Sequence, residues 1–248
     1  MSKIVAPGVP SIEQREGAWT HLQERLARAA RSRVLPCVTI SREFGCEGYP
    51  LAQRLKVLLE ASFGQPWSLF DKAMVDQVAS DENLSRQLLA HLGDESHAQD
   101  VLRTHFGFLT HNEAYARLVQ HIVQIASAGA AIIVGRGGAV VCQDLRNCFH
   151  VRLVGSFAFR AANLARRRQL STAEAEALVR TQSRLRETFI RECLHADIAD
   201  VRWYDAVLNN ERLGVESIAQ TCLRLVEQRW AESDGAAREP RHLLGAKP

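Results

Sequence analysis

The 248-residue sequence lacks the features that identify membrane, secreted and disulfide-stabilised proteins. No uncharged apolar stretch approaches the roughly 18 residues of a membrane-spanning helix, and the N-terminus has no long apolar segment. The six cysteines are dispersed, without a C-x-x-C pair, and most lie within apolar runs. We therefore expect a cytoplasmic protein with buried free thiols and no membrane partner.

Lysine is also scarce. Only four of the 31 basic residues are lysines, so the other 27 are arginines. Arginine suits bidentate binding of phosphate, but genomic base composition explains the same bias at least as well. The net charge of +3 does not require a nucleic-acid partner, because 28 acidic residues nearly balance the basic ones. We expect a globular protein that does not bind nucleic acid.

Motifs for hydrolytic and metal chemistry are absent as well. There is no Gly-x-Ser-x-Gly elbow and no H-E-x-x-H motif. Five histidines between residues 91 and 121 are separated by six, eight, six and ten positions, so none has another ligand type at the i, i+4 spacing. We expect no metal site built from protein side chains.

Short apolar runs alternate with segments of helical periodicity. The runs that we interpret as strands are residues 35–40, 67–70, 130–134, 148–154 and 204–208. The segments that we interpret as helices are residues 13–32, a stretch starting near Pro50, and residues 73–79, 157–168, 172–194 and 215–230. This order predicts an α/β fold, an open parallel sheet of about five strands flanked by helices, with ligands bound at the carboxyl ends of the strands.

The chain divides into three parts. Residues 1–33 are expected to form an arm and a helix, and residues 34–231 the main domain. Within that domain, residues from about 73 to 128 indicate a helical insertion beside the sheet. The tail, residues 232–248, is polar and rich in glycine, proline and alanine, which predicts disorder.

The most informative segment is 41–48, Ser-Arg-Glu-Phe-Gly-Cys-Glu-Gly, which links the first strand to a helix. Its layout is that of a phosphate-binding loop, in which the N–H groups from Gly45 to Gly48 cradle a phosphate ahead of the helix. The usual lysine and hydroxyl are missing, since Gly48 and Tyr49 fall on their positions. Arg42 could supply the missing charge. The alternative is an ordinary strand-to-helix turn.

Further candidates follow other strands. Arg136, within the Gly-Arg-Gly-Gly segment 135–138, could bind a substrate phosphate, and Asp71 could orient a substrate hydroxyl or base. A surface arginine and a helix N-cap are the respective alternatives. Two later helices carry eight arginines, of which we expect two or three to contact ligand: Arg160, Arg166, Arg167, Arg168, Arg180, Arg184, Arg186 and Arg191.

Four motifs together resemble the cytidylate kinase-like family, a branch of the P-loop nucleoside monophosphate kinases. They lie at residues 39–48, 70–72, 133–137 and 203–209, and the resemblance spans about residues 36–228. It implies a five-stranded parallel sheet with an insertion that binds the nucleoside monophosphate and an arginine-bearing lid at about 160–195. ATP and Mg²⁺ would be the cofactors, and nucleotides the substrates.

The resemblance also implies roles for individual residues. ATP phosphates would contact Ser41, Arg42, Gly45, Cys46, Glu47 and Gly48. The substrate would contact Asp71, Arg136 and Gly137. The transferring phosphoryl group would be stabilised by Arg42, Arg184 and Arg186. Gly137 replaces the aspartate that usually follows the arginine in true cytidylate kinases, and Glu47 and Tyr49-Pro50 are further departures.

Two nucleotide-binding functions fit these observations, and a degenerate structural domain that binds no nucleotide is a third possibility. The first is transfer of the γ-phosphoryl group of ATP to a CMP- or dCMP-type acceptor. The second is a catalytically impaired nucleotide-binding sensor or partner-binding module with a degenerate phosphate loop. Glu47, which would place a negative charge beside the phosphates, favours the second.

Overall fold

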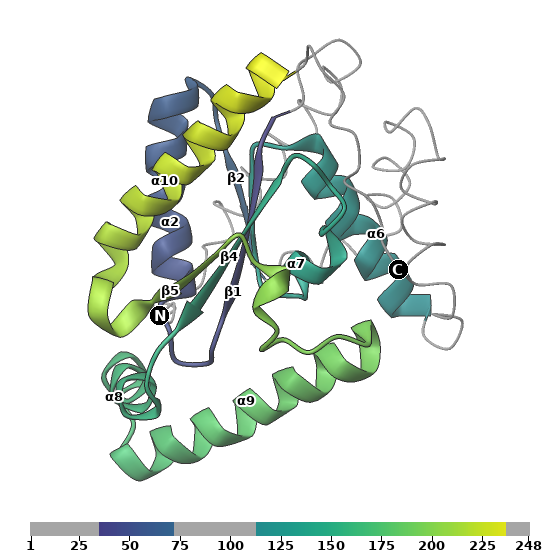
Figure 1. Ribbon diagram of the computed structural model, residues 1–248. Coiled ribbons are helices and arrows are strands. Elements are labelled where there is room, and N and C mark those ends of the chain that lie inside the picture. The colour runs from purple at the N-terminus through teal and green to yellow at the C-terminus, as the bar shows by residue number, and fades with distance from the viewer. Residues whose placement is uncertain (1–34, 72–112, 237–248) are drawn as a thin grey trace, which may run out of the picture.

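The computed structural model describes residues 35–71 and 113–236. Its five strands form one parallel sheet in the order β2-β3-β1-β4-β5 (Figure 1), which confirms the predicted fold class. The strands are β1 (Cys37–Arg42), β2 (Ser68–Phe70), β3 (Ala131–Val134), β4 (Cys148–Val154) and β5 (Ala206–Asn209). The expected helices at 13–32 and 73–79, and most of the expected insertion, lie outside the described residues.

Helices cover both faces of the sheet (Figure 1). One face carries α2 (Gly48–Phe63) and α10 (Asn210–Ala236), and the other carries α6 (Glu113–Ala128) and α7 (Gly138–Val141). The helices α8 (Phe157–Arg168) and α9 (Thr172–Leu194) lie beyond the carboxyl ends of the strands. None of the helices in the described ranges is long and apolar enough to cross a bilayer.

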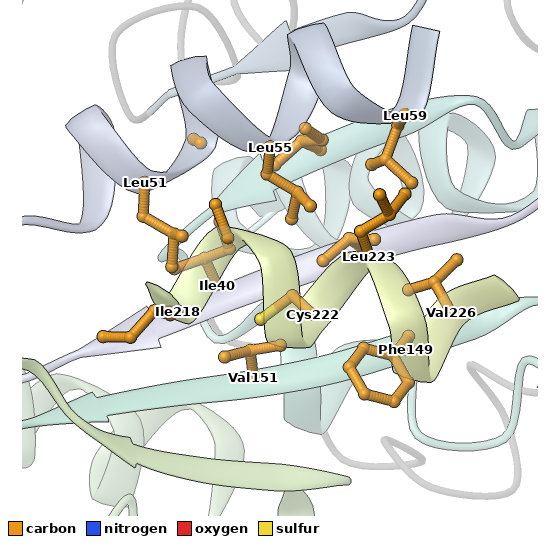
Figure 2. Packing of buried hydrophobic residues seen from close by; sticks show 14 of the residues in the cluster. Ile40, Leu51, Leu55, Leu59, Phe149, Val151, Ile218, Cys222, Leu223 and Val226 are labelled. Carbon is orange, nitrogen blue, oxygen red and sulfur yellow. The ribbon is translucent and has the colours of Figure 1, made fainter. Parts of the chain in front are cut away.

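The core on the α2 and α10 face follows from the periodicity of its elements. Leucines recur every four residues along α2, so one stripe of this helix is buried against the sheet. Figure 2 shows these side chains packed with residues of α10 and of strands β1 and β4. The labelled members of this cluster are Ile40, Leu51, Leu55, Leu59, Phe149, Val151, Ile218, Cys222, Leu223 and Val226.

Local capping explains why α8 and α9 have the expected bounds. The Ser156 Oγ accepts the N–H of Phe159, and Ser171 and Glu174 form a reciprocal capping box at the start of α9. Both helices end at a residue in the left-handed conformation, Gln169 and His195. We call the segment from Phe157 to Leu194 the α8–α9 hairpin.

The structure differs from the expectation near the C-terminus. Strand β5 begins at Ala206 rather than at Tyr204, because Tyr204 is the C-cap of a 3₁₀ helix over Val201–Trp203. Helix α10 starts at Asn210, contains a break at Gly214 with φ 70° and ψ 167°, and continues to Ala236. It therefore extends into the expected tail at 232–248, of which residues 237–248 lie outside the described residues.

Candidate functional site

A cavity of about 310 Å³ lies at the carboxyl edge of the sheet. Residues at the ends of the neighbouring strands β1 and β3, the segment Gly135–Gly138, helix α9, and Ile198 and Tyr204 line it. Parallel strands bring loops that are distant in sequence to one edge. For this reason the segments at 41–48 and 135–138 meet here.

The cavity is rich in positive charge. Three arginines line it, Arg42, Arg136 and Arg186, and none of its described lining residues is acidic. Burial, aided by the charge of Arg186, lowers the pKa of Arg42 to about 9, although Asp71 opposes the shift. Burial also lowers the pKa of Arg186 to about 10. Because three guanidinium groups line it and no acidic side chain among the described residues does, the cavity favours an anionic ligand.

Two glycines make room for the Arg42 side chain. A Cβ atom at Gly48 would lie 3.0 Å from Arg42 Cδ, and one at Gly135 would lie 2.1 Å from Arg42 Nη1. The side chain thus passes the start of α2 and ends beside Gly135. Since Gly48 is aligned with the usual lysine of a phosphate loop, this course supports the interpretation that Arg42 takes over the charge of that lysine.

The rest of the loop is held by protein groups. The Cys46 N–H donates to the Glu43 carbonyl at 3.1 Å, and the Glu47 N–H donates to Asn210 Oδ1 at 2.7 Å. Asn210, only 1% exposed, also donates from Nδ2 to Glu47 Oε2 at 3.4 Å. Two of the four N–H groups expected to cradle a phosphate therefore already have protein acceptors, and the Glu47 carboxylate is held by Asn210.

The structure divides the predicted site residues into two sets. The residues that line the cavity are Ser41, Arg42, Arg136, Gly137 and Arg186. The residues outside its lining are Gly45, Cys46, Glu47, Gly48, Asp71 and Arg184. Gly45 lies directly against α8, since a Cβ atom there would lie 2.6 Å from the carbonyl oxygen of Arg160.

Burial also determines the state of the thiol in this loop. It raises the pKa of Cys46 to about 12, and the nearby charge of Glu43 adds to the effect. The thiol is therefore neutral at physiological pH, so Cys46 brings no negative charge to a phosphate. Its side chain packs instead with the apolar cluster beneath α2.

The backbone around Arg136 is unusual. Gly135, Arg136 and Gly137 all have positive φ, at 85°, 54° and 69°. A left-handed conformation costs a non-glycine residue about 1–2 kcal/mol, so its presence at a cavity is an indication of function. A Cβ atom at Gly137 would lie 2.2 Å from Leu194 Cδ1, so the aspartate expected from the resemblance would require the Leu194 side chain to shift.

Arg152 is not among the residues predicted from the sequence; it lies beside Ser41 in the β1–β4 register and is 7% exposed. Its Nη1 donates to Tyr204 Oη at 3.2 Å and to Ser41 Oγ at 3.5 Å, and its guanidinium carbon lies 5.4 Å from the Tyr204 ring centroid. Both partners are neutral, and no carboxylate among the described residues forms an ion pair with it. The sequence does contain a signal for Arg152, because an arginine within a mostly apolar strand is unusual.

Arg184 and Arg186 lie on different faces of α9. Positions two apart on an α-helix are separated by about 200°, so two such side chains cannot face the same cavity. Arg186 lines the cavity, whereas Arg184 is exposed and lies with Arg180 and Arg191 on another surface of the helix. The spacing in the sequence shows that the two arginines face different ways. It does not show which of them faces the cavity, because that depends on how α9 is oriented in the fold.

We expect Arg186→Met to weaken binding of pyrophosphate about 10- to 100-fold, since a charge-assisted hydrogen bond contributes about 1.5–3 kcal/mol. Arg184→Met is expected to weaken it less than about 3-fold, because an exposed charge is well screened. Isothermal titration calorimetry of the two variants measures both. Equal losses would show that both arginines reach the anion.

Metal ligands do not gather in the part of the chain that the structure describes. No group of three or more histidine, cysteine, aspartate or glutamate side chains there is placed to hold a metal ion.

Comparisons with known proteins agree with this architecture. The sequence matches the cytidylate kinase-like family over residues 37–212, which is more than half of the chain. A crystal structure described as an uncharacterized protein from Eubacterium ventriosum ATCC 27560 is similar in fold, with a TM-score of 0.62 and 18% identity over 78% of this chain and 98% of that one. A comparison with curated proteins gives no significant match. On the family match, this chain belongs to the cytidylate kinase-like family.

Proposed function

We propose that this protein transfers the γ-phosphoryl group of ATP to a nucleoside monophosphate, with CMP or dCMP as the acceptor. Family membership supports a nucleotide-binding, nucleoside monophosphate kinase-like role. The observation that carries the proposal is the convergence of Arg42, Arg136 and Arg186 on one cavity beside the 41–48 loop. Phosphoryl transfer depends mainly on positioning and on charge stabilisation, which such a cluster supplies.

The cavity suggests how an acceptor would bind. Its arginine end suits a phosphate group, and its remaining lining includes the apolar side chains of Val140, Phe189 and Ile198. A small phosphorylated ligand with a flat, partly apolar body fits this combination. Arg136, with its left-handed backbone, would bind the acceptor phosphate, and Arg42 and Arg186 would lie against the transferring group.

The loop that would bind the phosphates of ATP already uses N–H groups in hydrogen bonds within the protein. ATP could use the Glu47 N–H only by displacing Asn210 Oδ1 from its 2.7 Å hydrogen bond. No described carboxylate lines the cavity, so Mg²⁺ would enter bound to the phosphates of ATP and to water. We assign no step to a protein-bound metal.

The hydrogen bonds of Glu47 and Cys46 favour a second candidate, a nucleotide-binding module without transfer activity. If these N–H groups keep their protein acceptors, the loop can hold a nucleotide through Arg42 but cannot align its phosphates for transfer. Such a protein would act as a sensor or as part of a larger assembly.

An assay of ADP formation with each nucleoside monophosphate, combined with calorimetry, separates the two functions. We expect Mg²⁺-dependent turnover with a cytidine nucleotide, and a loss of monophosphate affinity of about 10-fold or more in Arg136→Ala. Binding without turnover would support the module. A folded protein that neither binds nor turns over any nucleotide would contradict both.

We also propose a cytoplasmic location. All six cysteines are free, and the buried ones lie in apolar clusters where they act as small apolar side chains. This pattern is typical of proteins kept in a reducing compartment. We propose nucleotides as the ligands, and no nucleic-acid or membrane partner.

A further inference from the structure

Phe44 joins the phosphate loop to the α8–α9 hairpin. It lies in the loop between β1 and α2, and its ring packs against the small apolar cluster inside the hairpin. The buried members of that cluster are Ala161, Leu164, Ala175 and Val179. A loop residue thus completes the packing of two helices that begin more than a hundred residues later.

The same ring contacts two arginines of the hairpin. The guanidinium carbon of Arg186 lies 4.8 Å from the ring centroid of Phe44, and that of Arg168 lies 5.9 Å from it. Both distances are within the range of a cation–π interaction. Arg186 is the more important of the two, because its side chain also lines the cavity.

Backbone carbonyls of the loop form the second part of the junction. Arg186 Nη1 donates to the Arg42 carbonyl at 3.4 Å, and Arg160 Nη1 donates to the Phe44 carbonyl at 3.4 Å. Asn163 Nδ2 donates to the Gly45 carbonyl at 2.6 Å. Three carbonyls of the loop therefore accept hydrogen bonds from side chains of the hairpin.

The contact with the Phe44 ring matters for Arg186 because few other protein groups compensate the charge of its guanidinium. It forms no ion pair with a carboxylate among the described residues, and its one hydrogen bond is long. Arg42, which carries the same charge, lies close enough for the two to repel each other. The face of the Phe44 ring, 4.8 Å from the guanidinium carbon, supplies a compensating attraction.

We propose that Phe44 is a positioning residue that holds Arg186 toward the cavity and so couples the phosphate loop to the α8–α9 hairpin. The proposal rests on the proposed function in so far as the bound anion is a nucleotide phosphate. Phe44 does not line the cavity itself. It acts through Arg186.

The test is a double-mutant cycle with pyrophosphate and CMP as probes in calorimetry. Phe44→Leu is expected to weaken binding about 2- to 30-fold, the range of a cation–π interaction, while Phe44→Tyr keeps it within about 2-fold. In the Arg186→Met background, Phe44→Leu is expected to have no further effect, because the residue through which it acts is gone. A purely structural role would weaken binding equally in both backgrounds and would overturn the proposal.

Phe157→Leu is the matched control. The Phe157 ring belongs to the same apolar cluster and lies 4.4 Å from the guanidinium carbon of Arg180, which does not line the cavity. Its ring also lies 6.0 Å from the guanidinium carbon of Arg160, which does not line the cavity either, so its loss is expected to lower the melting temperature and to change affinity less than about 2-fold. If Phe44→Leu does not fold, Phe44→Met replaces it, since methionine keeps most of the apolar volume.

The outcomes separate this inference from the proposed function. Wild-type protein that binds the probes without turnover leaves the cycle fully measurable and contradicts only the transfer activity. Wild-type affinity in Phe44→Leu would overturn the role of Phe44 alone. Absence of any binding by the wild-type protein would overturn both.

Discussion

Replacing Arg42 by methionine is expected to lower kcat/KM for ADP formation about 100- to 1,000-fold, the usual effect of removing one preorganised charge from a transition state. Arg42 lines the cavity, its side chain passes Gly48, and we propose that it supplies the charge of the lysine that other phosphate loops carry. Methionine keeps the length of the apolar stem but has no charge. A coupled assay at saturating ATP measures the change.

The same substitution is expected to raise the melting temperature. Burial lowers the pKa of Arg42 to about 9, so holding its charge costs stability at every pH below that value. The cost disappears when the charge is removed. Arg224→Met is the control, because Arg224 is 80% exposed on α10 and should alter neither quantity. A variant that unfolds more readily yet keeps full activity would show that Arg42 is structural.

Gly135→Ala is expected to lower kcat/KM about 10- to 100-fold while leaving the protein folded. The new Cβ atom would lie 2.1 Å from Arg42 Nη1, so the Arg42 guanidinium must move. The proposed charge-assisted hydrogen bond from Arg42 to the bound phosphate would then be lost. The φ of 85° adds about 1–2 kcal/mol of backbone strain. The assay is paired with a thermal melt.

Gly64→Ala isolates the backbone strain. Gly64 ends α2 with φ 65°, and a Cβ atom there would meet nothing within 4 Å. We expect this variant to lose about as much stability from backbone strain as Gly135→Ala does, and to keep its kcat/KM. If the two variants lose activity equally, displacement of Arg42 is not the cause.

The elements that were predicted best have signals within their own sequence. Helices α8 and α9 begin after serine caps that bond to their own first turns, so their bounds match the expectation. Strand β3 is wholly apolar because helices cover both faces of the sheet. Strand β5 begins later than expected, because Asp200 caps a 3₁₀ helix just before it.

The site was predictable only in part. The motifs at 41–48 and 135–138 identified two loops, and the rules for parallel sheets placed them at one edge. Burial of Arg152 beside Ser41 and the bond between Asn210 and Glu47 join residues more than a hundred positions apart, so no local pattern reports them. The direction in which α9 faces the cavity separates Arg186 from Arg184 and likewise needs the assembled fold.

The sequence by itself determined the family, the order of strands and helices along the chain, and the two glycine-rich loops, because each depends on neighbouring residues or on recurring motifs. The tertiary structure alone decided which arginines share a cavity, how Arg42 reaches it past Gly48 and Gly135, and how Asn210 restrains Glu47. The physical reason is that charge compensation and close packing depend on distances between side chains, and the fold sets these distances independently of separation along the chain.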